Sequence, residues 1–458
     1  MKNKIRKILF VTPPFEKIIE PIYDRPKFIR PSLAYLAGHI IKNSAYEVKC
    51  IDAKFERKNL IGLSREIFSF NPDIIGISSY TYEIDEAKKL IKEIRKKLSK
   101  VLIVIGGSHI TALPKETMEN ISGIDIGVIG EGEDVFLQIS HCFFENRNFS
   151  EISGIVFRKK GKILINKKRH YFDLNNYFIP AWNLFPPAEE YFIQFSRGCP
   201  FSCNFCFNPN GKTIRYRNID KIIEEINFII KKFNPKRISF GDEVFGIDKK
   251  KTYELLEKMK IANINKKISW DIQTHVSAID NQLLFRVKEL GIAKIEVGIE
   301  SGNEEILKNM GKSINKEMIS TAFRKIKKFD IKTGAFFIFG HPNETRKTIW
   351  DTIKFAAKIN PTEPIFAIMV PFPGTSVFEY ARKREKGYCG LPKKWSNYRK
   401  QINSSTGFKD LSTKRLKYYF IIANIYFFIY NFRFLDLFKF FLNNRESALF
   451  FLRNMKND

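Results

Sequence analysis

The sequence predicts an α/β protein built from three parts. These are an N-terminal domain with a flavodoxin-like or Rossmann-like parallel sheet, a partial (β/α)6 barrel of the TIM type, and a helical C-terminal region. The chain has 458 residues, and roughly 100–200 residues per domain allow about two to four domains. Its 44% hydrophobic and 28% charged residues exclude wholesale disorder. Short β-branched runs alternate with helical patterns twice along the chain, as βαβ units require.

The first alternation occupies residues 1–145. Crossovers between parallel strands are right-handed, so these runs predict one compact, doubly wound domain. The expected strands are 8–11, 48–51, 74–78, 101–105 and 126–129, and the expected helices are 32–42, 60–69, 84–98 and 115–120.

Small and polar residues follow all five of these strands. In an open parallel sheet, ligands bind outside the carboxyl ends of the strands, and glycine lets a backbone approach a ligand closely. Any one of these loops could be an ordinary turn, whereas five in succession favour a bound ligand. The residues are Thr12, Pro13, Pro14, Asp52, Ser78, Ser79, Tyr80, Thr81, Gly106, Gly107, Ser108, His109, Gly130, Glu131, Gly132 and Glu133.

Residues 146–190 are predicted to connect the two alternations through a hairpin and a proline-rich strap. Residues 191–381 then alternate strand and helix six times, which predicts a partial barrel with its chemistry at the carboxyl ends of the strands. The expected strands are 191–196, 237–240, 268–273, 294–299, 332–339 and 365–370, and the expected helices are 220–233, 249–261, 281–290, 303–310, 315–329 and 346–359.

Residues 382–458 lose the strand pattern and become helical and aromatic. No stretch reaches the ~20 apolar residues of a membrane span, and the apolar run 8–11 is too short for a signal peptide, so a cytoplasmic location is expected. The aromatic residues could pack against the barrel as a helical cap. Alternatively, the region could make a peripheral membrane contact, with Lys417, Arg433 and Lys439 at the headgroups.

The chain is strongly basic. Its 78 Lys and Arg against 49 Asp and Glu give a formal charge of +29, which raises the question of nucleic acid or anionic membranes. A polybasic site would form a local block of charge, but the longest runs, 158–160 and 167–169, have only three residues. The abundance of Lys, Asn, Ile and Phe matches AT-rich codons. We therefore expect solvated basic faces and no nucleic-acid partner.

Three of the six cysteines, Cys199, Cys203 and Cys206, fall on one short segment after a predicted strand. The other three are scattered, so a disulfide framework is not expected. Three thiolates on one tight loop can hold three irons of a cubane cluster and leave the fourth iron free to bind another molecule. A zinc site would need a fourth Cys or His nearby, and no His lies between His170 and His275.

This Cys-x3-Cys-x2-Cys arrangement resembles that of the radical SAM superfamily. There the unique iron chelates S-adenosylmethionine, and electron transfer cleaves its sulfonium to a 5′-deoxyadenosyl radical. The resemblance implies that Cys199, Cys203 and Cys206 are the catalytic cluster ligands. It also implies cofactor contacts from Gly241, Asp242 and Glu243 near the methionine ammonium, from Glu300 and Ser301, and from Gly340 near the adenosine. The matching segments, in family order, are 240–243, 298–302 with Leu307, Met310 and Lys312, 340–345, and 371–375.

The N-terminal domain resembles the cobalamin-binding domain of cobalamin-dependent radical SAM enzymes, in segments 12–14, 31–37, 72–78, 106–109 and 130–133. The Asp-x-His-x-x-Gly motif, whose His ligates cobalt in many cobalamin proteins, is missing. The resemblance implies cobalamin bound without a His ligand. His109 could contact the corrin periphery or simply cap its loop, and similar domains without cobalamin exist. The implied contacts are Pro13, Ser78, Ser79, Gly106, Gly107, His109 and Glu131.

The resemblance implies an enzyme that methylates an unactivated carbon of a small-molecule or lipid-like substrate. Methylcobalamin would be the methyl donor, and flavodoxin or ferredoxin the reducing partner. Cyclisation, rearrangement or oxidation within the same family is one alternative. Methylthiotransferase-like RNA modification is another, but those enzymes carry three further cysteines in the N-terminal domain, where this chain has Cys50 and Cys142. The intact cysteine triad argues against a third alternative, a non-catalytic cobalamin or membrane sensor.

Overall fold

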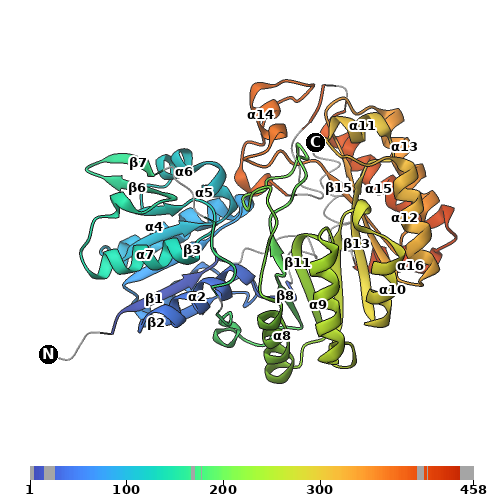
Figure 1. Cartoon of the computed structure of the whole chain (residues 1–458). Helices are drawn as coiled ribbons and strands as arrows, with labels where there is room; N and C mark the ends of the chain where they lie inside the picture. The colour runs from blue at the N-terminus through green and yellow to red at the C-terminus, as the bar shows by residue number, and fades with distance from the viewer. Residues whose placement is uncertain are drawn as a thin grey trace. The chain divides into compact units, whose positions relative to one another are not determined.

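The structure is a computed structural model that describes residues 5–14, 26–166, 171–176, 178–399, 407–409 and 411–443. The chain divides into two compact units. The described residues up to Tyr191 belong to the first unit, and those from Phe192 belong to the second (Figure 1).

A seven-stranded sheet forms the first unit, in the order β2-β1-β3-β4-β5-β6-β7. The first five strands are parallel, and their 2-1-3-4-5 order is that of flavodoxin-like folds, as the sequence predicts. The hairpin β6–β7 continues the sheet in antiparallel fashion, so part of the predicted connector extends this domain. The strands are β1 (Lys7–Val11), β2 (Glu47–Ile51), β3 (Ile74–Ser78), β4 (Leu102–Gly106), β5 (Ile126–Val128), β6 (Ile155–Lys159) and β7 (Lys162–Asn166).

The helices of the first unit pack in two groups. Helix α2 contacts α7, and α3 contacts α4, which fits a sheet covered on both faces. Helix α7 was not predicted, since the glycines before it point only to a loop. The helices are α2 (Pro31–Asn43), α3 (Leu60–Phe70), α4 (Ile84–Lys97), α5 (Ser108–Ala112), α6 (Pro114–Asn120) and α7 (Glu133–Phe144), with short 3-10 turns η1 (Thr81–Glu83), η2 (Phe149–Glu151) and η3 (Trp182–Leu184).

The proline-rich strap packs on α2. The indole of Trp182 is fully buried and meets the ring of Tyr35 edge-on at 6.1 Å between centroids. A Cβ at Gly38 would lie 2.5 Å from the carbonyl oxygen of Ile179. Glycine at position 38 therefore lets the strap cross α2 at close range.

A six-stranded sheet, β15-β14-β13-β12-β11-β8, forms the second unit, and β11 to β15 are parallel. Six strand–helix repeats confirm the predicted partial barrel. The strands are β8 (Glu190–Ile193), β9 (Ser196–Arg197), β10 (Arg215–Tyr216), β11 (Arg237–Phe245), β12 (Ser269–Thr274), β13 (Ile292–Glu300), β14 (Lys332–Phe339) and β15 (Glu363–Ile368).

The helices α8 to α14 of the barrel each begin after a residue whose side chain accepts a hydrogen bond from the first turn. These cap residues are Asn218, Asp248, Asp280, Asn303, Asn315, Thr345 and Thr375. The helices are α8 (Ile219–Phe233), α9 (Lys249–Ile261), α10 (Asn281–Glu289), α11 (Glu304–Asn309), α12 (Lys316–Lys328), α13 (Arg346–Ile359) and α14 (Ser376–Lys383), with 3-10 turns η4 (Ile264–Lys266), η5 (Val276–Ala278) and η6 (Trp395–Asn397).

The C-terminal region contributes α15 (Thr413–Tyr430) and α16 (Phe434–Asn443). Helix α15 packs against α13 and β15 and buries Tyr419, Phe427 and Phe428, as the helical-cap alternative predicts for the aromatic residues. Other aromatic residues of this region do not follow that prediction and are exposed: Tyr418, Phe432, Phe434, Phe438 and Phe441. The rest of the predicted helical stretch, from residue 444 onward, lies outside the described residues. No helix within the described part of the chain is both long and apolar enough to cross a bilayer.

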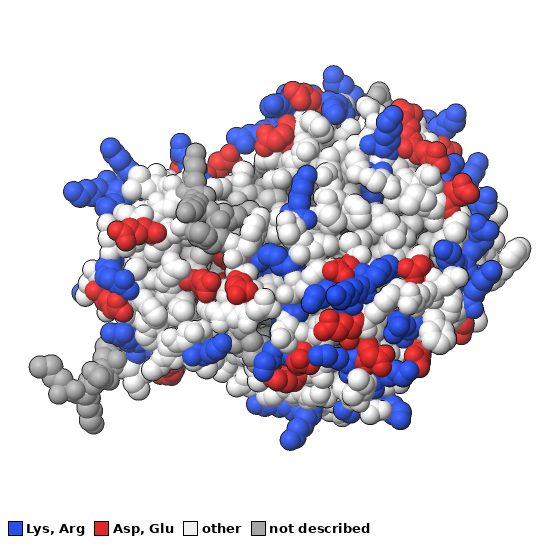
Figure 2. Space-filling view, viewed as in Figure 1, with Lys and Arg blue, Asp and Glu red and all other residues white. Residues whose placement is uncertain are grey.

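Charged side chains mix over the face shown in Figure 2, where Lys and Arg alternate with Asp and Glu. This mixed charge fits the solvated surface that we expect from the sequence.

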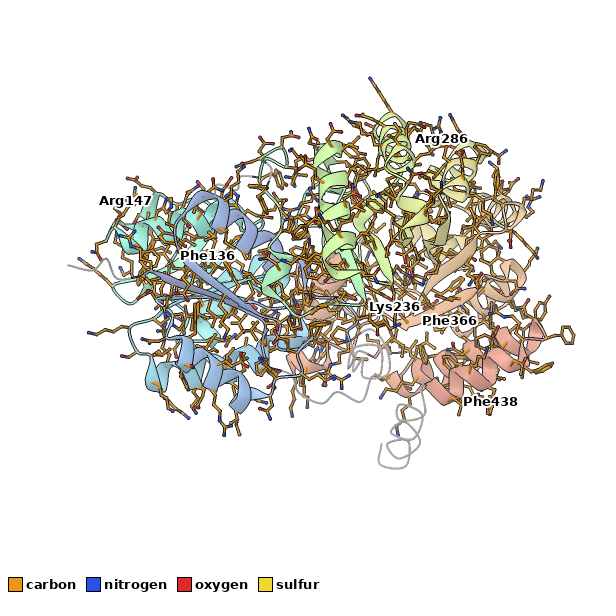
Figure 3. All side chains as sticks on the ribbon, turned by 90° about the horizontal axis from the view of Figure 1, so that it is seen from below. Phe136, Arg147, Lys236, Arg286, Phe366 and Phe438 are labelled. Atoms are coloured by element: carbon orange, nitrogen blue, oxygen red, sulfur yellow. The ribbon has the colours of Figure 1, made fainter. Side chains whose placement is uncertain are left out.

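Each unit has its own apolar core. In the first, Phe136 packs on Phe10 with ring centroids 4.6 Å apart, and in the second, Phe366 stacks on Phe337 at 5.2 Å (Figure 3).

Candidate functional site

The loop that carries the three cysteines follows β9 and is held by hydrogen bonds at its start. Gly198 has φ +107°, and a Cβ there would lie 2.3 Å from the carbonyl oxygen of Thr213, so glycine is required. The amide of Cys199 donates to the carbonyl of Gly211 at 3.1 Å. The Asn208 side-chain amide donates to the Cys199 carbonyl at 2.9 Å. The chain is thereby turned back on itself around the first cysteine.

The middle of this cysteine loop is held by the turn that ends α11. The backbone amide of Asn204 donates to the Met310 carbonyl at 3.0 Å, and its side-chain amide donates to the Asn309 carbonyl at 2.6 Å. Gly311 has φ +72°, and a Cβ there would lie 3.0 Å from the carbonyl oxygen of Ser202. The fourth-strand signature of the sequence therefore positions the loop between the first and third cysteines.

The thiols of Cys199 and Cys203 are half-buried and that of Cys206 is exposed, and none of the six cysteines, all of them described, forms a disulfide. Burial raises the pKa of Cys199 and Cys203, and the nearby Lys312 ammonium lowers it. Among the described residues, no three His, Cys, Asp or Glu side chains converge on a point for a single metal ion. A cubane needs no such convergence, because each thiolate binds a different iron.

A buried ion pair lies beside the cysteines. The Lys312 ammonium is 3.0 Å from Glu300 Oε1 and donates to the carbonyl of Gly298 at 2.7 Å. Glu300 has φ +72°, a conformation that costs a non-glycine residue of order 1–3 kcal/mol. A Cβ at Gly298 would lie 2.5 Å from Glu300 Oε1. Lys312 and Glu300 thus place one positive and one negative charge near Cys203, at the end of β13.

The two acidic residues at the end of β11 have different contacts. Asp242 accepts hydrogen bonds from the amides of Phe195 and Ser196 and from the Ser196 hydroxyl, and its burial raises its pKa to about 7. Glu243 accepts from the Gly198 amide at 3.2 Å and from the Asn210 side chain. Asp242 therefore ties β9 to the sheet, whereas Glu243 holds the cysteine loop itself. A Cβ at the neighbouring Gly241 would lie 3.2 Å from the ring of Phe192.

The predicted contacts Ser301 and Gly340 lie at the ends of β13 and β14. The Ser301 hydroxyl is buried and lies 3.0 Å from that of Thr352. Gly340 has φ +91°, and a Cβ there would lie 3.1 Å from Leu416. Ser301 therefore joins two elements of the barrel, and Gly340 packs under α15.

A buried polar cluster follows Gly340. Glu344 accepts from the amides of Gly340 and His341 through one carboxylate oxygen. Its other oxygen, both ring nitrogens of His341 and the Tyr388 hydroxyl have no hydrogen-bond partner among the residues that the structure describes. Burial lowers the pKa of His341 to about 3 and raises that of Glu344 to about 7. His341 is therefore neutral at physiological pH, and its ring meets Phe205 of the cysteine loop at 5.7 Å between centroids.

Replacement of Glu344 by Gln is expected to change how stability depends on pH. The pKa is about 7 in the folded chain and 4.5 for an ordinary Glu, so the unfolded state loses this proton first as pH rises. The contribution of Glu344 to the unfolding free energy is then fully present below pH 4.5. It decreases by about 3 kcal/mol as the pH rises from 4.5 through 7. Urea unfolding at several pH values should show this loss in the parent but not in Glu344→Gln.

The exposed Glu305 on α11 provides the control. Glu305→Gln should follow the parent at every pH. A stability difference between Glu344→Gln and the parent that stays constant from pH 4.5 to 8 would contradict the assignment.

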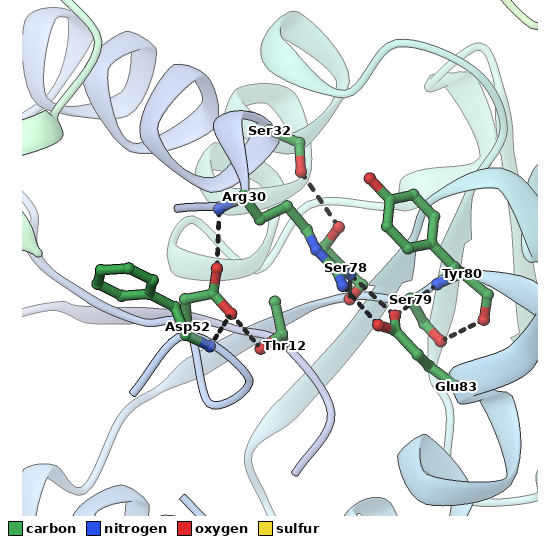
Figure 4. A network of polar contacts seen from close by, with 9 residues as sticks. Thr12, Arg30, Ser32, Asp52, Ser78, Ser79, Tyr80 and Glu83 are labelled. Atoms are coloured by element: carbon green, nitrogen blue, oxygen red, sulfur yellow. Dashed lines mark hydrogen bonds and ion pairs between the residues drawn. The ribbon is translucent and has the colours of Figure 1, made fainter. Parts of the chain in front are cut away.

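A second polar network lies at the carboxyl ends of β1, β2 and β3 in the first unit (Figure 4). The Arg30 guanidinium contacts Glu83 at 2.6 Å, donates to the Ser78 carbonyl at 2.8 Å, and lies 4.2 Å from the centroid of the Tyr80 ring. The Arg30 amide donates to Asp52 at 2.8 Å. The Arg30 guanidinium holds the pKa of Glu83 below its usual value despite burial. The buried Arg30–Glu83 pair thus holds the loop after β3, and the Arg30 backbone amide joins it to the loop after β2.

The glycines after β4 leave room at this edge. A Cβ at Gly107, which has φ +109°, would lie 2.3 Å from the Ser79 carbonyl oxygen, whereas one at Gly106 would meet nothing within 4 Å. Gly107 therefore allows two loops to touch, and Gly106 faces open space that a ligand can fill. The hydroxyl of Ser78, near Ser32 at 3.2 Å, lies at the same edge.

Other predicted strand-end residues are buried or engaged. Pro13 is buried at the end of β1. His109 is buried on α5, and its pKa is lowered by burial to about 4, so its imidazole is neutral. Glu131 accepts a hydrogen bond from the Phe172 amide at 2.7 Å. Pro13 and His109 are thus part of the buried interior of the first unit, and Glu131 contacts the connector.

Sequence reasoning did not select Arg30, Glu83 or His275, and it named Lys312 only as part of a motif. The ring of His275 stacks on Phe201 of the cysteine loop at 3.9 Å. An acidic residue soon after a strand end is the one local signal that could have found Glu83. The partners of Arg30, Glu83 and His275 lie far away in the sequence, so local patterns do not reveal these pairs.

Family models match both units. The radical SAM superfamily model matches residues 193–356, and the B12-binding domain model matches residues 28–140. The first span contains the cysteine loop and the Lys312–Glu300 pair. The second contains the Arg30–Glu83 network and Gly106. Each match thus falls on one of the two sites.

Two curated relatives and one solved structure are similar over most of this chain. The uncharacterized methyltransferase PH0819 of Pyrococcus horikoshii is 32% identical over 82% of this chain and 83% of its own length. The anaerobic magnesium-protoporphyrin IX monomethyl ester cyclase of Rubrivivax gelatinosus is 26% identical over 76% of this chain and 65% of its own length. The radical S-adenosylmethionine methyltransferase TsrM of Kitasatospora setae, solved with cobalamin and a [4Fe-4S] cluster, has the same fold, with a TM-score of 0.69 at 18% identity over 85% of this chain and 80% of its own. The chain therefore belongs to the cobalamin-dependent radical SAM enzymes, which use a [4Fe-4S] cluster, S-adenosylmethionine and cobalamin.

Proposed function

We propose that this enzyme methylates an unactivated carbon of a small-molecule or lipid-like substrate. The observation that carries the proposal is the combination, in one chain, of a clamped three-cysteine loop and a strand-end edge with open space at Gly106. PH0819, which covers most of this chain, is named a methyltransferase. When bound, the cluster and S-adenosylmethionine supply a substrate-activating radical, and cobalamin supplies the methyl group.

In this proposal, Cys199, Cys203 and Cys206 hold three irons of the cluster. Glu243 and the turn at 309–311 fix the loop, so the three thiolates would hold a bound cluster in a constant place. The Lys312 ammonium lies close enough to Cys199 and Cys203 to favour their thiolate forms. The Glu300 carboxylate and Gly340, at neighbouring strand ends, are proposed to contact S-adenosylmethionine, together with Gly241, Asp242, Glu243 and Ser301.

In the first unit, we assign the cobalamin contacts to the edge formed by Pro13, Ser78, Ser79, Gly106 and Gly107, with His109 and Glu131 nearby. The Arg30–Glu83 pair keeps the loops of this edge in place before the cofactor binds. His109 stays neutral through burial, and we propose that it supports its loop.

Gly106→Leu is expected to fold normally and to lose cobalamin. A Cβ at position 106 meets no atom within 4 Å, so the larger side chain fits the protein but fills the space proposed for the corrin. We expect the affinity for cobalamin to fall at least about tenfold, which corresponds to ~1.4 kcal/mol of lost binding, so corrinoid absorption at sub-saturating cobalamin should fall with it. Cobalamin content per chain, measured from the visible spectrum, checks this. Gly62→Ala, on α3, should keep full content, and equal loading of Gly106→Leu would refute the assignment.

Radical SAM enzymes need a reductant and a substrate. For this chain we propose a flavodoxin or a ferredoxin as the electron donor. A lipid-like substrate would suit a C-terminal region that makes a peripheral membrane contact. Cyclisation remains the second candidate because the Rubrivivax gelatinosus relative is named a cyclase. RNA methylthiolation has less support, since Cys50 and Cys142 are both buried in the first unit, on β2 and α7.

Feeding cells with methyl-labelled methionine tests the proposal. Metabolites and lipids are compared between cells with the gene, cells without it, and cells that carry the Cys199→Ala variant. Methylation predicts a compound that carries the label and requires both the gene and Cys199. A gene-dependent compound without the label would favour cyclisation or rearrangement and reject methylation.

A further inference from the structure

Helix α16 exposes a continuous apolar face. Its exposed side chains recur at the i, i+1, i+4, i+7 and i+8 positions of one helix surface. Single exposed apolar residues are normal, but contiguous patches of this kind mark interaction sites. We call this set the α16 face: Phe434 (57% exposed), Leu435 (77%), Phe438 (62%), Phe441 (42%) and Leu442 (56%).

Contacts fix α16 on the second unit. The Arg433 guanidinium, directly before the helix, donates to the carbonyls of Pro361 and Thr362 at 2.9 and 2.7 Å. On the opposite side of the helix, Phe440 meets Phe428 of α15 at 6.0 Å between centroids. Figure 3 shows Phe438 on the outer side of α16. The face is therefore presented by a held helix and does not result from a missing contact with the barrel.

The segment of the chain that carries the face is basic in composition. Between residues 413 and 443 the chain carries five cations and a single carboxylate. That carboxylate, Asp436, is paired with Arg433 at 2.7 Å. Phe432, 82% exposed, adds an aromatic ring at the start of the helix. The cations are Lys414, Arg415, Lys417, Arg433 and Lys439.

We propose that the α16 face docks on an anionic lipid surface. Aromatic and aliphatic side chains on one helix face, flanked by Lys and Arg, are the combination that inserts at the headgroup level of anionic membranes. The helix has ten residues, about 15 Å in length, so it lies in the plane of the interface and does not span the ~30 Å hydrocarbon core. Residues 444–458 carry three cations against two carboxylates, and a second copy of the chain has a formal charge of +29, so both complement the cations less well than an anionic lipid surface does.

This inference goes beyond the proposed function and does not rest on it, because lipid binding is measured without turnover. The full chain is sedimented with phosphatidylcholine vesicles that contain or lack phosphatidylglycerol. The chain should pellet with the anionic vesicles, stay in the supernatant with the neutral ones, and be released by high salt. The double variant Leu435→Glu/Phe438→Glu should reduce the bound fraction at least about tenfold.

The double variant Ile261→Glu/Phe285→Glu is the matched control. Ile261 on α9 and Phe285 on α10 of the same unit are 72% and 62% exposed, against 77% and 62% for Leu435 and Phe438. This control therefore makes the same change in charge and polarity at another place. It should bind vesicles like the parent. Circular dichroism of all variants checks that they fold, which we expect because the altered side chains are exposed.

Three outcomes would overturn the proposal. Equal loss of binding in Ile261→Glu/Phe285→Glu and in Leu435→Glu/Phe438→Glu would show a general charge effect. A dimer in lipid-free buffer that dissociates in the double variant would assign the face to a second copy. Vesicle binding that appears only after deletion of residues 444–458 would assign the face to that segment.

Discussion

Replacing any one of Cys199, Cys203 or Cys206 by Ala should reduce iron and sulfide content after anaerobic reconstitution to a small fraction of the parent. Each thiolate is assigned to a different iron, so the loss of one leaves two irons of the cluster without a protein ligand. The loop itself should survive the change, because its hydrogen bonds come from backbone amides, Asn204 and Asn208. Reductive cleavage of S-adenosylmethionine should fall to the no-enzyme level.

Cys389→Ala is the control for these variants. Cys389 is exposed, as is Cys206, but it lies outside the cysteine loop. Iron content and activity in Cys389→Ala should equal those of the parent. A triad variant that keeps both the iron and the cleavage activity would remove the basis of the cluster assignment.

Glu83→Ala should strongly destabilise the first unit. Glu83 and Arg30 are both buried and 2.6 Å apart, so loss of the carboxylate leaves a buried guanidinium without its counter-charge. Removing one partner of a buried ion pair costs about 3–5 kcal/mol. Because Arg30 also donates to the Ser78 carbonyl, the strand-end edge should lose its shape, and cobalamin binding should weaken together with stability.

The pair formed by Lys7 and Glu47 offers a comparison within the same unit. These two charges are 3.9 Å apart and partly exposed, so Glu47→Ala should cost no more than about 1 kcal/mol. Urea unfolding of the parent and of both variants checks the contrast. Similar destabilisation by Glu83→Ala and Glu47→Ala would mean that the buried pair does not organise the edge.

The sequence predicts the fold well where periodicity is strong. Helices α9 and α13 and strand β14 begin and end where their patterns do, because apolar residues at helical or alternating spacing have one way to reach the core. Helix α7 was not predicted, because the loop before it is rich in glycine. The β6–β7 hairpin was placed in a connector because nothing local shows that it adds to the edge of the sheet.

The candidate site divides in the same way. The cysteine loop was predicted because its three ligands lie close together in the sequence. Arg30 and Glu83 are 53 residues apart, and only the strand order β1-β3 brings them together. The sequence places Ser301 in a cofactor motif, whereas the structure shows that its hydroxyl lies 3.0 Å from that of Thr352, a contact that depends on the packing of α13.

Anaerobic incubation of the reconstituted enzyme with S-adenosylmethionine and a strong reductant tests the central claim most directly. The account predicts 5′-deoxyadenosine from the parent and from Cys389→Ala, none from Cys199→Ala, and corrinoid bands in the visible spectrum of the parent. Absence of 5′-deoxyadenosine from a parent enzyme that holds its cluster, or its formation by Cys199→Ala, would contradict the account.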